Sequence, residues 1–130
     1  MTKELQKELR KIAFHNRITV RFVNRGTVSE VDVNKGIIIV DLLPSGTTSR
    51  HISDFFHEMG HIVDYRQGLF SDYYQDYPSK QDLKKWTLKA EKHADDTGNR
   101  LMKSWYPERK FVYTYKYKKW QKFLKQYWGI

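Results

Sequence analysis

The segment His57-Glu58-Met59-Gly60-His61 constrains this chain more than any other, because it lies inside an apolar stretch from Ile52 to Val63. The apolar positions recur at helical spacing, which predicts a buried helix. On an α-helix, residues i and i+4 lie one above the other, so His57 and His61 would direct two imidazoles at one point. This arrangement predicts a metal site, and Glu58 would lie beside it, within reach of a metal-bound water.

Two histidines leave such a site incomplete, because a catalytic zinc ion usually has three protein ligands and a water. Glu91 is the best candidate for the third ligand, since it borders two alanines on the apolar side of a second predicted helix. A carboxylate buried there would cost several kcal/mol unless it met a cation. Asp95, one turn later, could accept the remaining N–H of a ligating imidazole. Asp64, three residues after His61, is the alternative: a rival ligand, a carboxylate supporting the ligands from behind, or a partner of nearby cations on its own helix.

The spacing His57-Glu58-x-x-His61 followed by Glu91-x-x-Ala94-Asp95 resembles the gluzincin pattern of zinc metallopeptidases. In that pattern H-E-x-x-H is completed by E-x-x-[SA]-D on a later helix. The resemblance implies that Glu91 is the third zinc ligand and that Asp95 lies behind a ligating histidine. A metzincin is disfavoured, because position 64 is Asp and position 67 is Gln.

The predicted order of elements also resembles the minimal zincin-like peptidases of phages and mobile elements. These include antirepressor peptidases that act on phage-type repressors. The resemblance covers roughly residues 18–101 and implies a zinc-dependent metalloendopeptidase with a protein or peptide substrate.

The chemistry expected of such a site is metal-assisted hydrolysis. Zinc lowers the pKa of its water toward 7, and Glu58 would act as the general base. Glu58 would then pass the proton to the leaving amine. Candidate donors to the oxyanion are phenols in the loop between the two ligand-bearing helices, and His93. His93 is two positions from Glu91 and is expected on the opposite, exposed side of its helix; the phenols are Tyr73, Tyr74 and Tyr77.

Hydrophobic periodicity predicts a single α+β domain over residues 1–130 with a minimal zincin-like fold. The expected elements are a helix over 2–14, strands from 18, over 28–33 and over 37–40, a helix over 49–67, a glutamate-bearing helix over 80–103, a strand-like stretch over 111–116 and a basic aromatic helix over 118–127. Short polar turns between the first three strands predict a three-stranded antiparallel meander. The unbroken apolar run 37–40 is typical of a strand covered on both faces. Gly60 predicts a close approach to its helix, by the sheet or by the turn that bears the second histidine.

The formal net charge of +9 is concentrated at the C-terminal end, where residues 103–130 contain eight Lys or Arg and one acid. These cations alternate with aromatic residues. Cations for phosphates and rings for bases are what single-stranded nucleic acid binding needs, so a nucleic-acid-binding segment is the second hypothesis. The plainer interpretation is that the rings complete the core and the lysines line a solvated face. A third hypothesis is a catalytically silent zincin scaffold that serves as a binding or virion-associated protein.

Several remaining features of the sequence limit the possible functions of the chain. The chain has no cysteine, which excludes disulfides and thiolate metal ligands. No apolar run reaches the roughly 18 residues of a membrane span, and the N-terminus lacks the apolar core of a signal peptide. We therefore expect a cytoplasmic protein, in a host cell or associated with a virion.

The alternative to a metal site is a helix whose histidines and glutamate are structural only.

Overall fold

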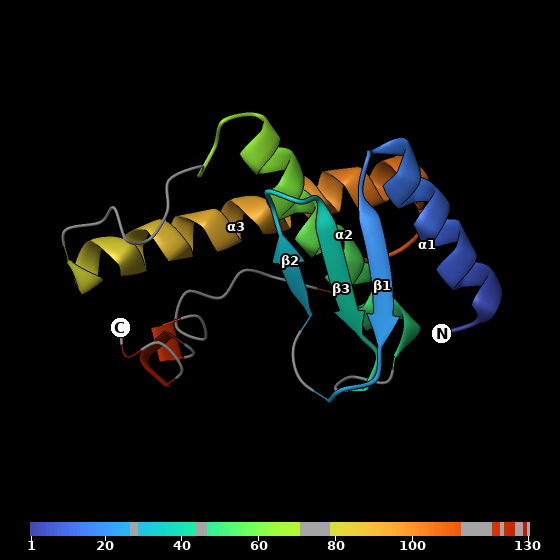
Figure 1. The fold of residues 1–130 in the computed structure, drawn as a ribbon, viewed down its shortest axis with the longest axis horizontal. Helices are drawn as coiled ribbons and strands as arrows, with labels where there is room; N and C mark the ends of the chain where they lie inside the picture. The colour runs from blue at the N-terminus through green and yellow to red at the C-terminus, as the bar shows by residue number, and fades with distance from the viewer. Residues whose placement is uncertain are drawn as a thin grey trace.

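The structure is a computed structural model that describes residues 1–26, 29–43, 47–70, 79–112, 121–122, 124–126 and 129. Its elements, in chain order, are α1 (Lys3–His15), β1 (Thr19–Val23), β2 (Glu30–Asp32), β3 (Ile37–Asp41), α2 (Thr48–Arg66) and α3 (Lys80–Trp105). The predicted α+β class is confirmed (Figure 1). The strand-like stretch and the basic aromatic helix predicted over 111–127 fall largely outside the described residues, although 121–122 and 124–126 are helical.

The three helices begin where the sequence provides hydroxyl caps. Thr2, Thr47 and Ser79 each accept a hydrogen bond from a backbone N–H in the first turn of α1, α2 and α3 respectively. Such caps satisfy donors that have no partner within the helix. At the other end of α2, Gly68 follows the C-cap with φ +79°, the left-handed conformation that glycine adopts without a steric penalty. The helix predicted over 49–67 therefore ends within one residue of its predicted end.

The three-stranded sheet differs from the predicted antiparallel meander. Its strand order is β1-β3-β2, with β3 paired parallel to β1 and antiparallel to β2. After β1 the chain crosses to the far side of β3, and the tight turn at 33–36 then brings β3 back between the other two strands (Figure 1). The predicted antiparallel pairing of the second and third strands is confirmed. The predicted pairing of the first strand with the second is wrong, because the most apolar strand, β3, occupies the centre and takes both as partners.

The two faces of β3 are not equally covered. Ile38 and Val40 are fully buried, whereas Ile37 and Ile39 remain partly exposed, so the expectation of a strand covered on both faces is only half right. The buried face carries α2, since α2 packs on β3 and β2. In turn α3 packs on α2, and α1 packs on β1. The molecule therefore stacks the sheet, α2 and α3 in that order, which buries α2 on two sides.

One continuous core joins the sheet to the helices. Its largest fully buried side chains come from α1, β3, α2 and α3, and include Leu9, Ile12, Ile38, Phe55, Phe56, Met59, Ile62 and Met102. Phe55 and Phe56 pack edge to face with ring centroids 4.9 Å apart. The apolar periodicity that predicted a buried helix is confirmed along the whole of α2.

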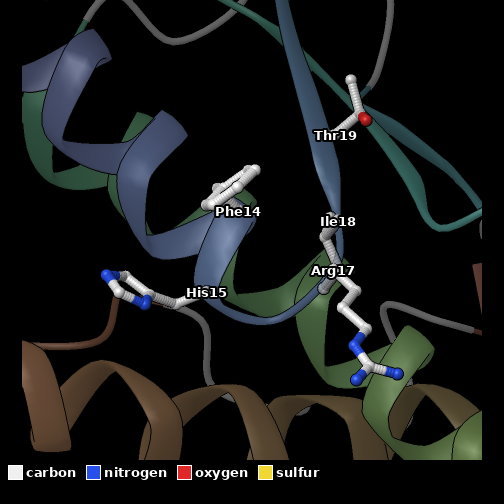
Figure 2. Close-up of a pocket in the computed structure, with 5 residues that line it drawn as sticks. All are labelled: Phe14, His15, Arg17, Ile18 and Thr19. Carbon is white, nitrogen blue, oxygen red and sulfur yellow. The ribbon is translucent and has the colours of Figure 1, made fainter.

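The C-terminal end of α1 is an exposed corner of the molecule. Phe14 is 81% exposed, and a shallow hollow of about 550 Å³ is lined by residues 14, 15 and 17–19 (Figure 2).

None of the helices among the described residues combines the length and the apolar composition that a membrane span requires.

Candidate metal centre

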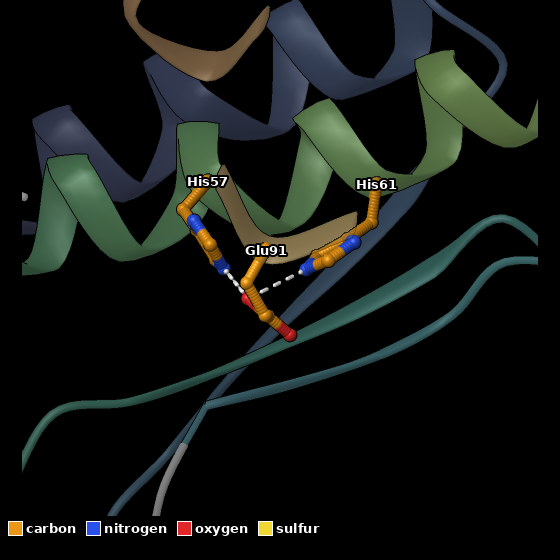
Figure 3. A group of neighbouring side chains, drawn as sticks. All are labelled: His57, His61 and Glu91. Carbon is orange, nitrogen blue, oxygen red and sulfur yellow. Dashed lines mark hydrogen bonds and ion pairs between the residues drawn. The ribbon is translucent and has the colours of Figure 1, made fainter. Parts of the chain in front are cut away.

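The predicted ligands meet between α2 and α3. His57 and His61 project from the same side of α2, one turn apart, and converge on Glu91 of α3 (Figure 3). Glu91 Oε2 lies 2.9 Å from His57 Nε2 and 3.1 Å from His61 Nε2. One ligand atom from each residue lies within 4.8 Å of the other two, so the three side chains could hold a metal ion.

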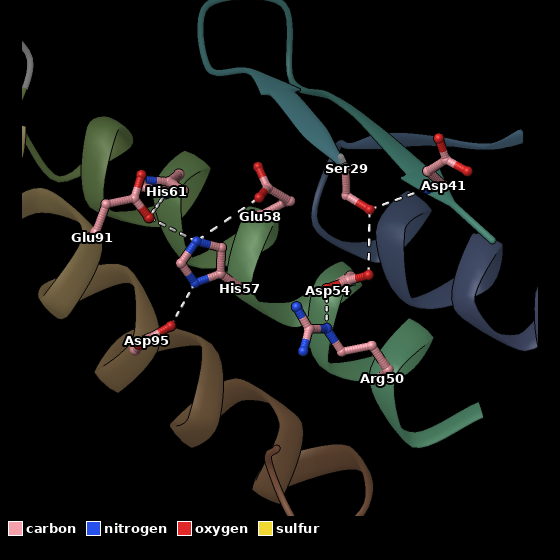
Figure 4. A network of polar contacts seen from close by, with 9 residues as sticks. All are labelled: Ser29, Asp41, Arg50, Asp54, His57, Glu58, His61, Glu91 and Asp95. Atoms are coloured by element: carbon pink, nitrogen blue, oxygen red, sulfur yellow. Dashed lines mark hydrogen bonds and ion pairs between the residues drawn. The ribbon is translucent and has the colours of Figure 1, made fainter. Parts of the chain in front are cut away.

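Asp95 fixes the orientation of His57. Its Oδ1 lies 2.6 Å from His57 Nδ1, one turn along α3 from Glu91 (Figure 4). A hydrogen on Nδ1 would be donated to this carboxylate, which leaves Nε2 facing Glu91 and free of a proton when it binds a metal. The structure thus brings Asp95 to the position that the sequence predicted for it.

The electrostatics of the cluster favour a cation. Burial alone would lower the pKa of His57, but hydrogen bonds with Asp95 and Glu91 raise that pKa well above its ordinary value. Burial would raise the pKa of Glu91, yet the imidazoles of His61 and His57 hold that pKa well below its usual range. Positive charge at the imidazoles therefore stabilises the buried carboxylates, and a divalent ion would take the place of these protons.

Glu58 lies beside the cluster without joining it. Its Oε1 is 3.8 Å from His57 Nε2, and its side chain is only 12% exposed. Burial raises the pKa of Glu58 to about 7, against the opposing effect of the two imidazoles. The carboxylate is therefore next to the His57 nitrogen that faces Glu91 and is shielded from bulk water, as expected of a general base.

The two ligand-bearing helices can approach this closely because each has a glycine at the crossing. A Cβ at Gly60 of α2 would lie 2.4 Å from the carbonyl oxygen of Ala94, and a Cβ at Gly98 of α3 would lie 2.6 Å from that of Phe56. The predicted close approach to Gly60 is confirmed, but the approaching element is α3 and not the sheet or the histidine-bearing turn.

Asp64 is buried next to the site but is turned to a different set of partners. Its Oδ1 accepts a 2.7 Å hydrogen bond from Thr97, and its Oδ2 lies 2.9 Å from His93 Nδ1. Both oxygens are thus engaged outside the His57–His61–Glu91 cluster, and Asp64 ties the C-terminal part of α2 to α3. His93 is 39% exposed and paired with Asp64. The predicted position on the opposite, exposed side of α3 was wrong, because the His93 ring turns toward α2 and contacts the buried Asp64.

A polar network next to Glu58 was missed by the sequence analysis. Ser29 donates a 3.4 Å hydrogen bond to Asp54 and accepts one of 3.0 Å from the backbone N–H of Asp41, while Arg50 Nε lies 3.4 Å from Asp54 (Figure 4). The network ties the segment before β2 and the end of β3 to the first turns of α2. Asp54 interrupts the apolar side of α2 one turn before Glu58, and that signal was present in the sequence. Ser29 lies in a loop, and no pattern in the sequence indicated its role.

The remaining predicted donors to the oxyanion are tyrosines. The phenols of the loop between α2 and α3, Tyr73, Tyr74 and Tyr77, lie outside the described residues, as do residues 113–120 of the basic aromatic segment.

Comparison of the chain with protein-family models, with curated proteins and with solved structures gave no match.

Proposed function

We propose that this chain is a zinc-dependent metallopeptidase in which His57, His61 and Glu91 hold the ion and Glu58 is the general base. The observation that carries the proposal is the convergence of Glu91 on both imidazoles from a different helix, with Glu58 beside them. Two imidazoles and one carboxylate form a ligand set used by catalytic zinc sites. Other divalent first-row ions accept the same ligands, so the preference for zinc rests on the resemblance to gluzincins.

The chain's own residues would each contribute to peptide hydrolysis. A bound zinc ion would supply the Lewis acid that makes water a nucleophile near neutral pH. Glu58 would accept the proton of the attacking water at its carboxylate and deliver it to the leaving amine. Asp95 would hold His57 in the tautomer and orientation that ligation requires.

The competing proposal is a scaffold that binds metal without cleaving anything. The position of Glu58 favours an enzyme, because a structural zinc site needs four protein ligands and has no use for a buried carboxylate at 3.8 Å from one of them. A cytoplasmic location and a peptide or protein substrate remain predictions from the sequence.

The activity can be tested without knowing the natural substrate. The zinc-loaded chain is incubated with a complex peptide library, and new termini are identified by mass spectrometry. We expect cleavage by the wild-type chain and a loss of at least about 1,000-fold in Glu58→Gln, because the proton transfer is removed while the ligands stay in place.

The matched control for this variant is Glu108→Gln, an exposed carboxylate beyond the end of α3, which should cleave like the wild type. Zinc content must be equal in all three proteins. Cleavage by Glu58→Gln at the wild-type rate would refute the proposed base, and zinc binding without any cleavage would favour the silent scaffold.

A further inference from the structure

Two of the most exposed aromatic side chains in the described part of the chain lie at the same corner of the molecule, away from the metal cluster. Phe14 lies in the last turn of α1 and is 81% exposed, while Trp105 ends α3 and is 45% exposed. His15 connects them, since it follows Phe14 directly and its ring centroid lies 6.2 Å from that of Trp105. Phe14 and His15 also line the hollow at the end of α1 (Figure 2).

The same corner carries positive charge. Arg17 lines the hollow, and Lys11 lies one turn before His15 on α1; both are exposed. The exposed guanidinium of Arg66 reaches this point from the end of α2 and donates to the backbone carbonyls of Asn16 and Arg17, the latter at 2.8 Å. Carbonyls carry no net charge, so these contacts hold Arg66 in place without neutralising it.

Within the described part of the chain, the cations of the corner are not neutralised by ion pairs. None of Lys11, Arg17 and Arg66 makes an ion pair with a described residue. Two acids, Glu8 and Glu108, lie close enough to Tyr106 to raise its pKa, and Glu8 accepts a hydrogen bond from it. The corner therefore joins exposed rings to unneutralised cations.

A single exposed ring on a surface is ordinary and needs no explanation. The combination here is more specific: exposed rings from two helices, a hollow where α1 leads into β1, and exposed cations at and near it, in a chain of net charge +9. A neutral apolar partner would gain nothing from the cations, and a simple anion would gain nothing from the rings. A single-stranded nucleic acid uses both, because its bases stack on rings while its phosphates pair with Arg and Lys.

We propose that the corner formed by Phe14, His15, Arg17, Arg66 and Trp105 binds single-stranded nucleic acid, with bases stacked on Phe14 and Trp105 and phosphates at Arg17 and Arg66. None of these residues belongs to the metal cluster, so this binding is independent of the proposed peptidase reaction. It would hold the chain on a nucleic acid while the metal centre stays open to a protein substrate.

The test is fluorescence anisotropy of a labelled twelve-nucleotide single strand, titrated with the full-length chain at about 50 mM salt. We expect Phe14→Ala and Trp105→Ala each to weaken binding about 10-fold, the loss expected for one stacked base. Arg17→Gln should weaken binding and reduce the salt dependence by a slope of about 0.7, the value for one phosphate contact on a single strand.

Two matched controls should bind like the wild type. Leu43→Ala removes an apolar side chain that is 56% exposed at the opposite end of the sheet. Lys85→Gln removes an exposed cation on α3, about 30 Å along the helix from Trp105. Circular dichroism and zinc content, compared across all variants, identify any variant that has not folded.

Three outcomes would overturn the proposal. The first is no binding of the single strand by the folded wild-type chain. The second is binding that Phe14→Ala and Trp105→Ala leave unchanged, which would place the contact elsewhere, for example in the basic segment 113–120. The third is equally tight binding of a twelve-residue acidic peptide with the same dependence on Phe14 and Trp105, which would assign the corner to a protein partner.

Discussion

At the scale of single residues, the site depends most on His57, because both of its ring nitrogens contact carboxylates. Nδ1 meets Asp95 and Nε2 meets Glu91, and the side chain is only 8% exposed. Glu91, Asp95 and Glu58 therefore lie around the two imidazoles, and Asp54 is close enough to raise the pKa of Glu58. Such an arrangement is stable only if the charges are balanced, which a divalent cation would achieve.

Asp95 is predicted to support the metal without touching it. We expect Asp95→Asn to weaken zinc binding about 10- to 100-fold, because the amide is a poorer acceptor for His57 Nδ1 and no longer favours the ligating tautomer. Competition with a chromophoric chelator measures the affinity. The neighbouring Asp96 is exposed, so Asp96→Asn is the control and should bind zinc normally. Equal affinities in the two variants would contradict the role given to Asp95.

Asp54 should make the stability of the fold depend on pH. Burial raises its pKa to about 6 from an ordinary value of 3.8, against the opposing effects of Arg50 and Ser29. The folded state therefore binds this proton more tightly than the unfolded chain does. The resulting stabilisation is fully present below about pH 4 and is lost as the pH rises through about 6.

Comparison with Asp54→Asn isolates this contribution. Urea unfolding at pH 4 to 7, in the presence of a chelator, should show the wild type losing about 1–3 kcal/mol relative to the variant as the pH rises. Asp96→Asn, which alters an exposed carboxylate, should show no such trend relative to the wild type. A constant difference between wild type and Asp54→Asn across this range would show that Asp54 titrates normally.

At the scale of elements, the decisive feature is the crossing of α2 and α3. The sequence predicted both helices to within two residues at each end, because hydroxyl caps and apolar periodicity are local signals. It also predicted that Glu91 and Asp95 face the histidines, since the cost of burying a carboxylate limits where it can be placed. The crossing depends on contacts between residues far apart in the chain. Two mid-helix glycines, Gly60 and Gly98, mark it in the sequence, and only Gly60 was interpreted in this way.

The crossing can be tested at that glycine. In Gly60→Ala the new methyl group would lie 2.4 Å from the carbonyl oxygen of Ala94, so α3 must move away from α2. We expect a loss of about 1–3 kcal/mol in unfolding free energy, together with at least about 10-fold weaker zinc binding, because Glu91 moves with α3. Chemical denaturation and chelator competition measure the two effects.

Gly68→Ala separates these two effects. Gly68 has φ +79° with open space around its Cβ position, so alanine costs about 1 kcal/mol or more in backbone strain but displaces no helix. This variant should be destabilised and yet bind zinc like the wild type. If Gly60→Ala also retained full zinc affinity, the close crossing would not be what positions the ligands.

At the scale of the whole molecule, the sheet and α3 hold α2 between them, and the metal cluster lies where α2 and α3 meet. The strand order was beyond the sequence, because three short strands can pair in several ways with similar hydrophobic burial, and the parallel pairing of β1 with β3 leaves no local signal. The network of Ser29, Asp54 and Arg50, which ties the sheet to α2, was missed because Ser29 lies in a loop far from Asp54 in the chain, although Asp54 itself interrupts the apolar side of α2.

The measurement that tests the central claim most directly is the zinc content of the purified chain beside that of its Glu91→Ala variant, by elemental mass spectrometry after reconstitution and desalting. Three ligands from two helices predict about one zinc ion per wild-type chain and a marked loss in the variant, with both proteins folded. No zinc in the folded wild-type chain, or equal zinc in the two proteins, would contradict the proposed metal centre.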